Sequence, residues 1–328
     1  MTSNFQKTVL VTGGTSGLGY HCALAIARQH PEYQVVIASR SDPNDSAGAI
    51  NSTLHQNNVR FLSLDLSKLA KVRSFVSEWE ACNFPPVHAF VFNAALQFPG
   101  DVDYTDDGFE KTFGISHVGH ALLFGLLRPH LAKTARIVIV SSGTHDPEQR
   151  SGMPDAVYNS AEELAHPTAE TSKNKGRQRY TSTKLANVLY TYALHQRFVA
   201  INQKNKEIHW TATAFDPGLM PGTGLARDAS GLEKFLWLSV LPKLLPLLRL
   251  LLSPNIHSPE ESGEALARLA VGADVEGKSG VYYEGLKEIK SSKASYVREK
   301  QEDLWQWTTG ALATSEAEKT LLSLRELL

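Results

Sequence analysis

Tyr180 and Lys184 are the two side chains of this sequence whose types and spacing best suit proton transfer. In a helix, side chains four positions apart project from the same face, one turn from each other. A phenol ordinarily titrates near ~10. An ammonium ~4 Å away contributes roughly 4 kcal/mol toward the phenolate at an effective dielectric of about 20. We therefore expect Lys184 to bring the Tyr180 phenol toward the working pH, where a proton donor is most effective.

Further polar residues follow two of the predicted strands. Ser141-Ser142 comes directly after the strand predicted at 136–140, and Asn93-Ala94-Ala95 follows the strand predicted at 89–92. Carboxyl ends of parallel strands meet at one edge of a sheet, where ligands bind. We expect these residues to converge with Tyr180 there. We assign the chemistry to Ser142, because Ser141 has the alternative role of a residue that only ends its strand.

A glycine-rich turn joins the first predicted strand to the first helix. The turn reads Thr-Gly-Gly-Thr-Ser-Gly-Leu-Gly over residues 12–19. Gly13 permits a tight turn, Gly17 lets the backbone approach a pyrophosphate, and Gly19 lets the helix pack close to the strand. Amides at the helix start would then face the phosphates. The pattern predicts a dinucleotide site, and the alternative is a glycine-rich turn that binds nothing.

Two residues at the ends of the second and third strands bear on the choice of cofactor. NAD-binding proteins place Asp or Glu at the end of the second strand, where this chain has Arg40. A guanidinium can bind a 2′-phosphate through two hydrogen bonds and stack on adenine, so we predict NADP(H). Asp65 follows the third strand, where it either accepts from the adenine amino group or caps the next helix.

Short strand-like runs alternate with helix-period segments along the chain. The runs are apolar on both faces, as in parallel strands covered on both sides, and lie at 8–11, 34–38, 60–64, 89–92, 136–140, 210–215 and 281–283. The expected helices lie at 18–28, 70–80, 109–131 and 181–199. Alternation of this kind predicts an α/β fold, a single doubly wound Rossmann domain over 1–328 with a seven-stranded parallel sheet.

Composition excludes several classes of function. Lys and Arg number 33 against 34 Asp and Glu, so no basic field is available for a nucleic acid. Two cysteines make no disulfide framework, and the close pair His117 and His120 lies in an apolar run where core or surface histidines are expected rather than metal ligands. Residues 1–7 carry no apolar secretory segment, which predicts a cytoplasmic protein.

Two segments do not follow the alternation of predicted strands and helices. Residues 143–179 carry three prolines and end in a basic run, 173–179; this insert covers the site, alters oligomer contacts or is a dispensable loop. His145 within it either contacts substrate or is an exposed loop residue. Leucine-rich 232–253 is interrupted by charges and prolines, so it is a lid over the substrate, a membrane-surface contact or ordinary core.

In chain order, the turn at 12–19, Asn93-Ala94-Ala95, Ser142, the Tyr180–Lys184 pair and Pro217-Gly218 resemble the short-chain dehydrogenase/reductase superfamily. The resemblance covers nearly the whole chain. Within the superfamily, residues 180–191, 218–225 and 280–283 resemble the branch of retinol dehydrogenases, carbonyl reductases and protochlorophyllide reductase. Photochemistry is not expected, because nothing in the sequence requires a pigment.

This resemblance implies a role for each catalytic residue. Tyr180 would be the general acid for a ketone, or the base for an alcohol, and Lys184 would bind the ribose hydroxyls of the nicotinamide. Ser142 would hydrogen-bond the substrate oxygen as charge develops on it. Many relatives carry an Asn that anchors a water in the relay to the lysine; here Ser116 takes its place, which leaves room for a protein that binds NADP(H) with little turnover.

The resemblance also implies the rest of the cofactor site. Pro217-Gly218-Leu219 would border the nicotinamide, and the Thr223 hydroxyl would lie near its carboxamide. The full set expected to bind NADP(H) is Gly13, Thr15, Ser16, Gly17, Leu18, Gly19, Arg40, Asp65, Leu66, Asn93, Ala94, Ala95, Tyr180, Lys184, Pro217, Gly218, Leu219 and Thr223.

The predicted function is NADPH-dependent reduction of the carbonyl of a bulky hydrophobic substrate, such as a polycyclic, terpenoid or polyketide-like ketone of secondary metabolism. A leucine-rich helical lid over 219–258 favours such a substrate, and residues 293–328 are expected to form C-terminal helices. The alternatives are an NADP(H)-binding regulator or scaffold, and a membrane-surface alcohol dehydrogenase of the retinol or steroid type that contacts the membrane through 232–253. A monomer and a homo-oligomer are both compatible with the sequence.

Overall fold

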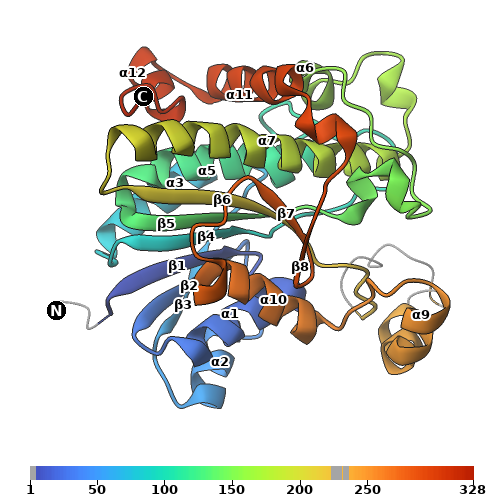
Figure 1. The fold of residues 1–328 in the computed structure, drawn as a ribbon, viewed down its shortest axis with the longest axis horizontal. Helices are drawn as coiled ribbons and strands as arrows, with labels where there is room; N and C mark the ends of the chain where they lie inside the picture. Colours follow the sequence, from blue (N-terminus) through green and yellow to red (C-terminus); the bar gives the residue numbers. More distant parts are fainter. Residues whose placement is uncertain (1–4, 223–230, 232–235) are drawn as a thin grey trace.

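The computed structural model describes residues 5–222, 231 and 236–328, which fold around one sheet of eight strands (Figure 1). The order across the sheet is β3-β2-β1-β4-β5-β6-β7-β8. The strands are β1 Lys7–Thr12, β2 Tyr33–Ser39, β3 Val59–Ser63, β4 Val87–Phe92, β5 Leu131–Val140, β6 His209–Asp216, β7 Val281–Glu284 and β8 Lys287–Ile289. The order reverses between β1 and β4, which makes the carboxyl ends of these two strands the expected ligand crevice.

The predicted α/β fold and its seven parallel strands are confirmed. Strands β1 to β7 pair in parallel, while β8 pairs antiparallel with β7. Strand β8 was not predicted from the sequence; it follows β7 after a tight turn at Gly285, where φ is 53°. Both β1 and β4 are apolar or threonine-rich and almost fully buried, as strands covered on both faces must be.

Helices cover both faces of this sheet (Figure 1). The first face carries α1 Gly17–Gln29, α2 Ser46–Leu54 and α10 Pro259–Val271. The second face carries α3 Leu69–Ala81, α5 Gly119–Leu127 and α7 Gly176–Lys204. Outside the second layer lie α6 Ala161–Ala165, α11 Arg298–Leu312 and α12 Glu316–Leu322. Helix α10 begins with a capping box, because Ser258 and Glu261 each accept the other's backbone N–H.

The helix bounds differ from the sequence prediction at several places. The helix predicted over 109–131 comprises α4 Lys111–Phe113, a π-helical turn at Gly114–Val118 and α5, and β5 already begins at Leu131. The helix predicted from residue 181 begins at Gly176. Helices α2 and α10 lie where no helix was predicted. Helix α10 does carry an apolar face, with Leu266, Leu269 and Ala270 buried, so its periodicity was available in the sequence and was missed. The π-helical turn and the exact helix ends depend on tertiary contacts, which hydrophobic periodicity does not report.

One buried arginine fixes the first turn of α7. The Arg179 guanidinium forms an ion pair with the buried carboxylate of Glu110 at 3.2 Å. It also donates to the carbonyl oxygens of Gly100 and Asp101, at 2.8 and 2.9 Å. The chain at Phe98 approaches α7 so closely that a Cβ on Gly176 would lie 1.7 Å from its carbonyl oxygen. Arg179 therefore ties the start of α7 to the loop that follows β4.

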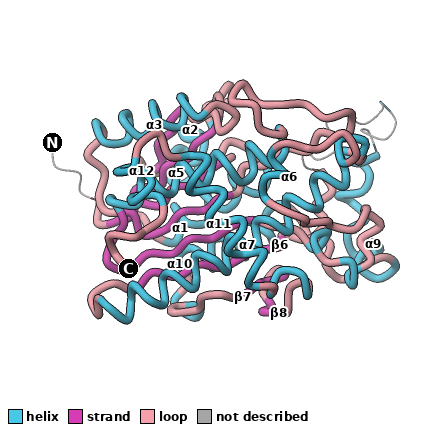
Figure 2. The backbone as a smooth tube through the Cα atoms, turned by 90° about the horizontal axis from the view of Figure 1, so that it is seen from above, coloured by secondary structure: helices cyan, strands magenta, loops and turns pink. Residues whose placement is uncertain are grey.

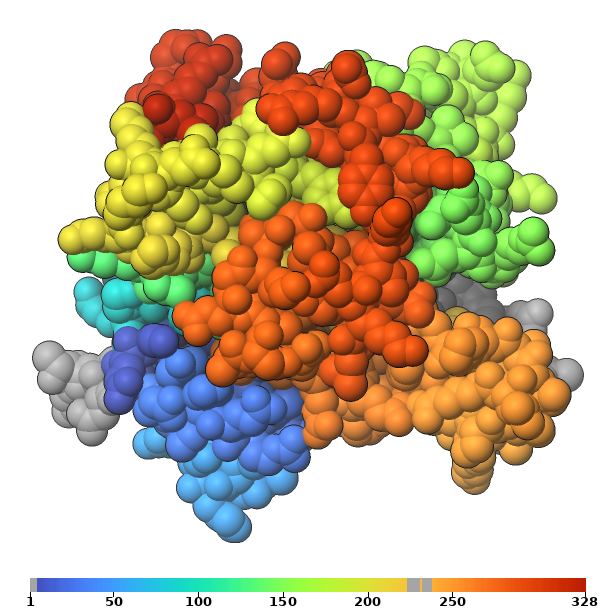
Figure 3. All heavy atoms as spheres, in the orientation of Figure 1, coloured from blue at the N-terminus to red at the C-terminus, as the bar shows by residue number. Residues whose placement is uncertain are grey.

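Helix α9, Leu245–Leu251, lies at the end of the molecule where the carboxyl ends of the strands meet (Figures 1 and 2). The segment around it forms a lobe beside the layered body (Figure 3). No helix within the described residues has the length and hydropathy required to cross a membrane.

We predict that Arg179→Met lowers the free energy of unfolding by about 3 kcal/mol, because it leaves the Glu110 carboxylate buried without its partner. Urea denaturation measures this change. Lys133→Met removes an ion pair with Glu207 whose two members are both exposed, and it should cost less than about 1 kcal/mol. Equal losses in the two variants would contradict a stabilising role for the buried pair.

Candidate active site

An open cleft of about 1900 Å³ runs along the carboxyl edge of the sheet. Seventeen of the residues expected from the sequence line it, and they are Gly13, Thr15, Ser16, Gly17, Leu18, Arg40, Asp65, Leu66, Asn93, Ala94, Ala95, Ser142, Tyr180, Lys184, Pro217, Gly218 and Leu219. Gly19 and Ser116 lie behind the lining, and Thr223 lies outside the described residues. The structure thus gathers residues from six strand ends and two helices in one place.

The turn between β1 and α1 has a backbone that requires its glycines. Gly13 and Gly17 have φ values of 65° and 52°, in the left-handed region that favours glycine. A Cβ on Gly19 would lie 2.3 Å from the Gly13 carbonyl oxygen, so any larger residue would push helix from strand. Ser16 at the start of α1 makes no side-chain cap, which leaves the first amides of the helix open to an anion. These features fit the pyrophosphate of a dinucleotide.

Arg40 and Asp65 lie at the β2 and β3 end of the cleft. Arg40 is exposed, and its guanidinium has no ion pair or hydrogen bond among the described residues. Asp65 accepts from the backbone N–H and the hydroxyl of Ser67, at 3.0 and 2.6 Å. It does not cap α3, whose first amide, at Leu69, donates to Asp107 instead. The helix-cap interpretation of Asp65 is therefore wrong, although the residue still lines the cleft.

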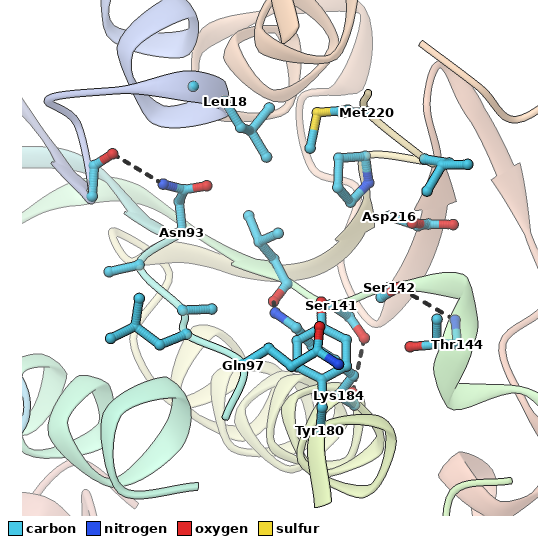
Figure 4. A pocket seen from close by; sticks show the side chains of 18 of the residues that line it. Leu18, Asn93, Gln97, Ser141, Ser142, Thr144, Tyr180, Lys184, Asp216 and Met220 are labelled. Atoms are coloured by element: carbon cyan, nitrogen blue, oxygen red, sulfur yellow. Dashed lines mark hydrogen bonds between the residues drawn. The ribbon is translucent and has the colours of Figure 1, made fainter. Parts of the chain in front are cut away.

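Tyr180 and Lys184 lie side by side on α7, below the strand ends (Figure 4). The Lys184 ammonium lies 5.5 Å from the centre of the Tyr180 ring. It donates to the Val140 carbonyl oxygen at 3.1 Å, an oxygen that also accepts from the Asn187 amide at 3.0 Å. The Ser141 hydroxyl donates to the Lys184 carbonyl at 2.8 Å, so Ser141 attaches α7 to the end of β5.

The electrostatics of this pair differ from the expectation. Burial lowers the pKa of Lys184 to about 8, against the field of Asp216, which raises it. Burial is also the main influence on Tyr180, and it raises the pKa of the phenol well above its usual range; the Asp216 charge adds to this, and a hydrogen bond with Ser142 opposes it. The expected lowering of the phenol pKa by Lys184 is thus absent, because burial and the Asp216 charge together raise it.

Ser142 faces the cleft between Tyr180 and the chain that follows β5. Its hydroxyl oxygen accepts from the Thr144 backbone N–H at 3.3 Å. Its carbonyl accepts from Nδ1 of His145 at 2.7 Å, and Nε2 of the same ring accepts from the Ser292 backbone N–H. His145 is fully buried, so neither of the roles considered from the sequence applies. It fixes the segment after Ser142 against the C-terminal part of the chain.

Asp216 is a site residue that the sequence analysis missed. It ends β6, is buried, and lines the cleft beside Ser142 (Figure 4). Its carboxylate accepts from the Gly218 backbone N–H at 3.0 Å and from the Asn255 amide at 2.9 Å. The sequence feature that could have identified Asp216 as a site residue is its position as a lone acidic residue at the carboxyl end of a buried strand, directly before Pro217-Gly218.

Ser116 lies in the π-helical turn before α5. Its hydroxyl is buried and has no partner among the described residues, while its carbonyl accepts from Nδ1 of His120 at 3.0 Å. Burial lowers the pKa of His120 to about 4, so the ring is neutral and its Nε2 accepts from the Thr12 hydroxyl at 2.8 Å. The Thr12 oxygen in turn accepts from the Asn93 backbone N–H. His120 is therefore a satisfied core residue.

A dinucleotide-type crevice that also holds a phenol beside an ammonium defines an oxidoreductase that uses NAD(P). Comparison with known proteins agrees with this class. A family model described as short chain dehydrogenase matches residues 7–161. The human protein "Polyprenol dehydrogenase" is 31% identical over 308 residues, which cover 92% of this chain and 83% of the relative.

The chain therefore belongs to the short-chain dehydrogenase/reductase family, in the branch of retinol dehydrogenases and protochlorophyllide reductase, and acts on a CH–OH/C=O pair. "Protochlorophyllide reductase, chloroplastic" of Pisum sativum is 29% identical over 294 residues, which cover 85% of this chain and 69% of the relative. The crystal structure of a blue fluorescent protein from a metagenomic library in complex with NADPH shares the fold. Its TM-score is 0.59 at 20% identity, over 87% of this chain and 99% of that one.

We predict that Asp216→Asn shifts the alkaline limb of kcat/KM for carbonyl reduction to lower pH by about one pH unit. The Asp216 charge raises the pKa of both Lys184 and Tyr180, so its removal lets both lose their protons at lower pH. The measurement is a pH profile with a ketone that the parent reduces. The control is Glu284→Gln, which removes another carboxyl group of the same cleft. The charge of Glu284 does not shift the pKa of Tyr180 or Lys184, so this variant should keep the alkaline limb of the parent. An identical limb in parent and Asp216 variant would refute the coupling.

Proposed function

We propose that this protein is an NADPH-dependent reductase of the carbonyl group of a bulky apolar substrate. The observation that carries the proposal is the arrangement of Tyr180, Lys184 and Ser142 in one cleft with the glycine turn. A nicotinamide, when bound, supplies the hydride. The protein must then orient the carbonyl and deliver a proton to its oxygen.

Tyr180 is the proton donor in this proposal. Its raised pKa keeps the phenol protonated at neutral pH, which suits donation to an oxygen that becomes negative as reduction proceeds. The Ser142 hydroxyl donates a second hydrogen bond to the same oxygen. Lys184, which is charged below its pKa of about 8, stabilises the phenolate that remains and holds the ribose hydroxyls. Ser116, which the resemblance placed in the proton relay, lies behind the lining with its hydroxyl without a partner among the described residues, so this proposal does not route the proton through it.

Arg40 supports NADP(H) as the cofactor. A free guanidinium at the end of β2 has the geometry and charge to bind a 2′-phosphate, and no carboxylate takes the position that would accept from a ribose 2′-OH. Members of the cofactor set that follow β1 and β4 line the middle of the cleft, and they are Gly13, Thr15, Ser16, Gly17, Leu18, Asn93, Ala94 and Ala95. Among the described residues, Pro217, Gly218 and Leu219 lie on the opposite side, where they would border the nicotinamide.

Apolar side chains support a bulky hydrophobic substrate. Phe98, Met153, Leu219 and Leu252 contribute to the lining beyond Tyr180. Two of them belong to the segment 219–258, which we propose as the substrate lid. A cleft of this composition binds an apolar body through contact area, while its few polar groups orient the carbonyl.

We predict that Tyr180→Phe lowers kcat for ketone reduction by about 100-fold or more, because the general acid is lost, while NADPH binding persists. The assay follows NADPH oxidation over a panel of hydrophobic ketones, with fluorescence of bound NADPH as the binding measurement. The parent should prefer NADPH to NADH. Binding of NADPH without turnover by the parent, unchanged in Ser116→Asn, would instead support an NADP(H)-binding regulator or scaffold.

A second candidate function is a membrane-surface alcohol dehydrogenase, which the leucines of α9 favour. Leu250, Leu251 and Leu252 are 82%, 69% and 70% exposed. Leu252 also lines the cleft, so this apolar surface continues into the proposed substrate site. An apolar surface at the mouth of an active site suits an enzyme that takes its substrate from a lipid layer.

For this candidate, the parent should sediment with phosphatidylcholine vesicles, and the triple variant Leu250→Ser/Leu251→Ser/Leu252→Ser should bind them at least about tenfold more weakly. Burial of each leucine in the lipid contributes about 1.5–3 kcal/mol when complete. Leu286→Ser, at the β7–β8 turn, replaces an equally exposed leucine away from the cleft and should match the parent. A parent that stays in the supernatant would remove the membrane candidate.

A further inference from the structure

The basic run before Tyr180 remains unexplained by the proposed reductase chemistry. The described lining of the cleft contains five cationic side chains, those of Arg40, Lys111, Arg150, Arg177 and Lys184. Lys184 is bound to the end of β5, Lys111 forms an ion pair with Asp103, and Arg40 lies at the cofactor end. Arg150 and Arg177 have no ion pair and no side-chain hydrogen bond within the described chain.

Arg177 lies on the same helical stripe as the catalytic pair. Positions 177, 180 and 184 follow the i, i+3, i+7 spacing of one helix face, and all three line the cleft. The helical rise places the Arg177 backbone about 4.5 Å beyond that of Tyr180, toward the helix start and away from Lys184. Along α7, Arg177 therefore lies on the side of Tyr180 opposite Lys184.

Arg150 reaches the same cleft from a different part of the chain. It ends the short helix Pro147–Gln149, and residues 149–153 line the cleft after Ser142. The acidic residues of the described lining are Asp42, Asp65, Asp216 and Glu284. None of them belongs to the segments 97–99, 149–153 or 177, so the lining segments that hold Arg150 and Arg177 contain no carboxylate.

We propose that the substrate carries an anionic group, a carboxylate or phosphate, that Arg177 and Arg150 bind on the side of the carbonyl opposite Lys184. A guanidinium binds such oxygens through paired, charge-assisted hydrogen bonds. Phe98 and Met153, in the same part of the lining, would contact the apolar body. The substrate is then an amphipathic keto acid or keto phosphate. This inference deepens the proposed reductase function and rests on it.

The test measures ligand binding by titration calorimetry to the protein saturated with NADP⁺, which cannot reduce a ketone. The ligands are aryl keto carboxylates with increasing numbers of methylene groups between ketone and acid, each paired with its methyl ester, and one matched phosphonate. At the best length, the acid should bind about tenfold more tightly than its ester, and the preference should shrink as salt is added.

Arg177→Gln should abolish the preference for acid over ester, Arg177→Lys should retain part of it, and Arg150→Gln should reduce it. Lys175→Gln makes the same change of charge two residues away, outside the lining, and should keep the full preference. Equal affinity for acid and ester throughout the series, an absence of binding by every acid, or a preference that survives in the Arg150→Gln/Arg177→Gln double variant would overturn the inference.

A second measurement, NADPH oxidation with the same acids and esters, separates this inference from the reductase proposal. A protein that prefers the acids but oxidises no NADPH with any of them keeps the anion site and loses the proposed reaction. A protein that reduces the esters as efficiently as the acids keeps the reaction and loses the anion site. A phosphonate that binds more tightly than the carboxylate identifies phosphate as the preferred anion.

Discussion

Removing the ammonium of Lys184 from water is the costly step around which this cleft is organised. An unpaired buried cation is strongly unfavourable, and the side chain is 2% exposed. The Val140 carbonyl oxygen supplies a direct acceptor, and the negative charge of Asp216 favours the protonated form. The Ser141 hydroxyl holds the backbone of Lys184 itself. The position of α7 against β5, and with it the position of Tyr180, follows from keeping this charge in place.

Asp216 links the catalytic pair to the other side of the cleft. Gly218 precedes the segment 223–235 and Asn255 follows it, and one carboxylate accepts from both. Leu219 and Ile256 also form a parallel bridge. The two ends of the proposed lid thus meet at the carboxylate whose charge acts on the catalytic pair. Changes at either end of the lid are coupled to the electrostatics of Tyr180 and Lys184 through a single side chain.

The sequence predicted the parts of this structure that depend on neighbouring residues. The glycine turn, the one-turn spacing of Tyr180 and Lys184, and the seven parallel strands all follow from local pattern. His145 could not be placed in this way, because its burial depends on Ser292 and on Tyr282, whose ring lies 4.9 Å away. Arg179 belongs to the basic run 173–179, yet Glu110 and the loop after β4 bury it. Partners so distant in sequence leave no periodic signal.

The π-helical turn at Gly114–Val118 links two parts of the cleft that the sequence treats separately. A π turn holds one more residue than an α turn and changes the direction in which the following side chains point. Here it directs Ile115 into the cleft and turns Ser116 behind it. The Ser116 carbonyl accepts from His120, and His120 accepts from Thr12, the residue that ends β1 and binds the amide of Asn93. A continuous series of hydrogen bonds therefore runs from the helix beside the catalytic pair to the glycine turn.

A residue at position 116 acts on Lys184 only if its side chain reaches the cleft. Its backbone carbonyl maintains the series of hydrogen bonds whatever the side chain is. The serine at this position is thus compatible with an intact cofactor turn.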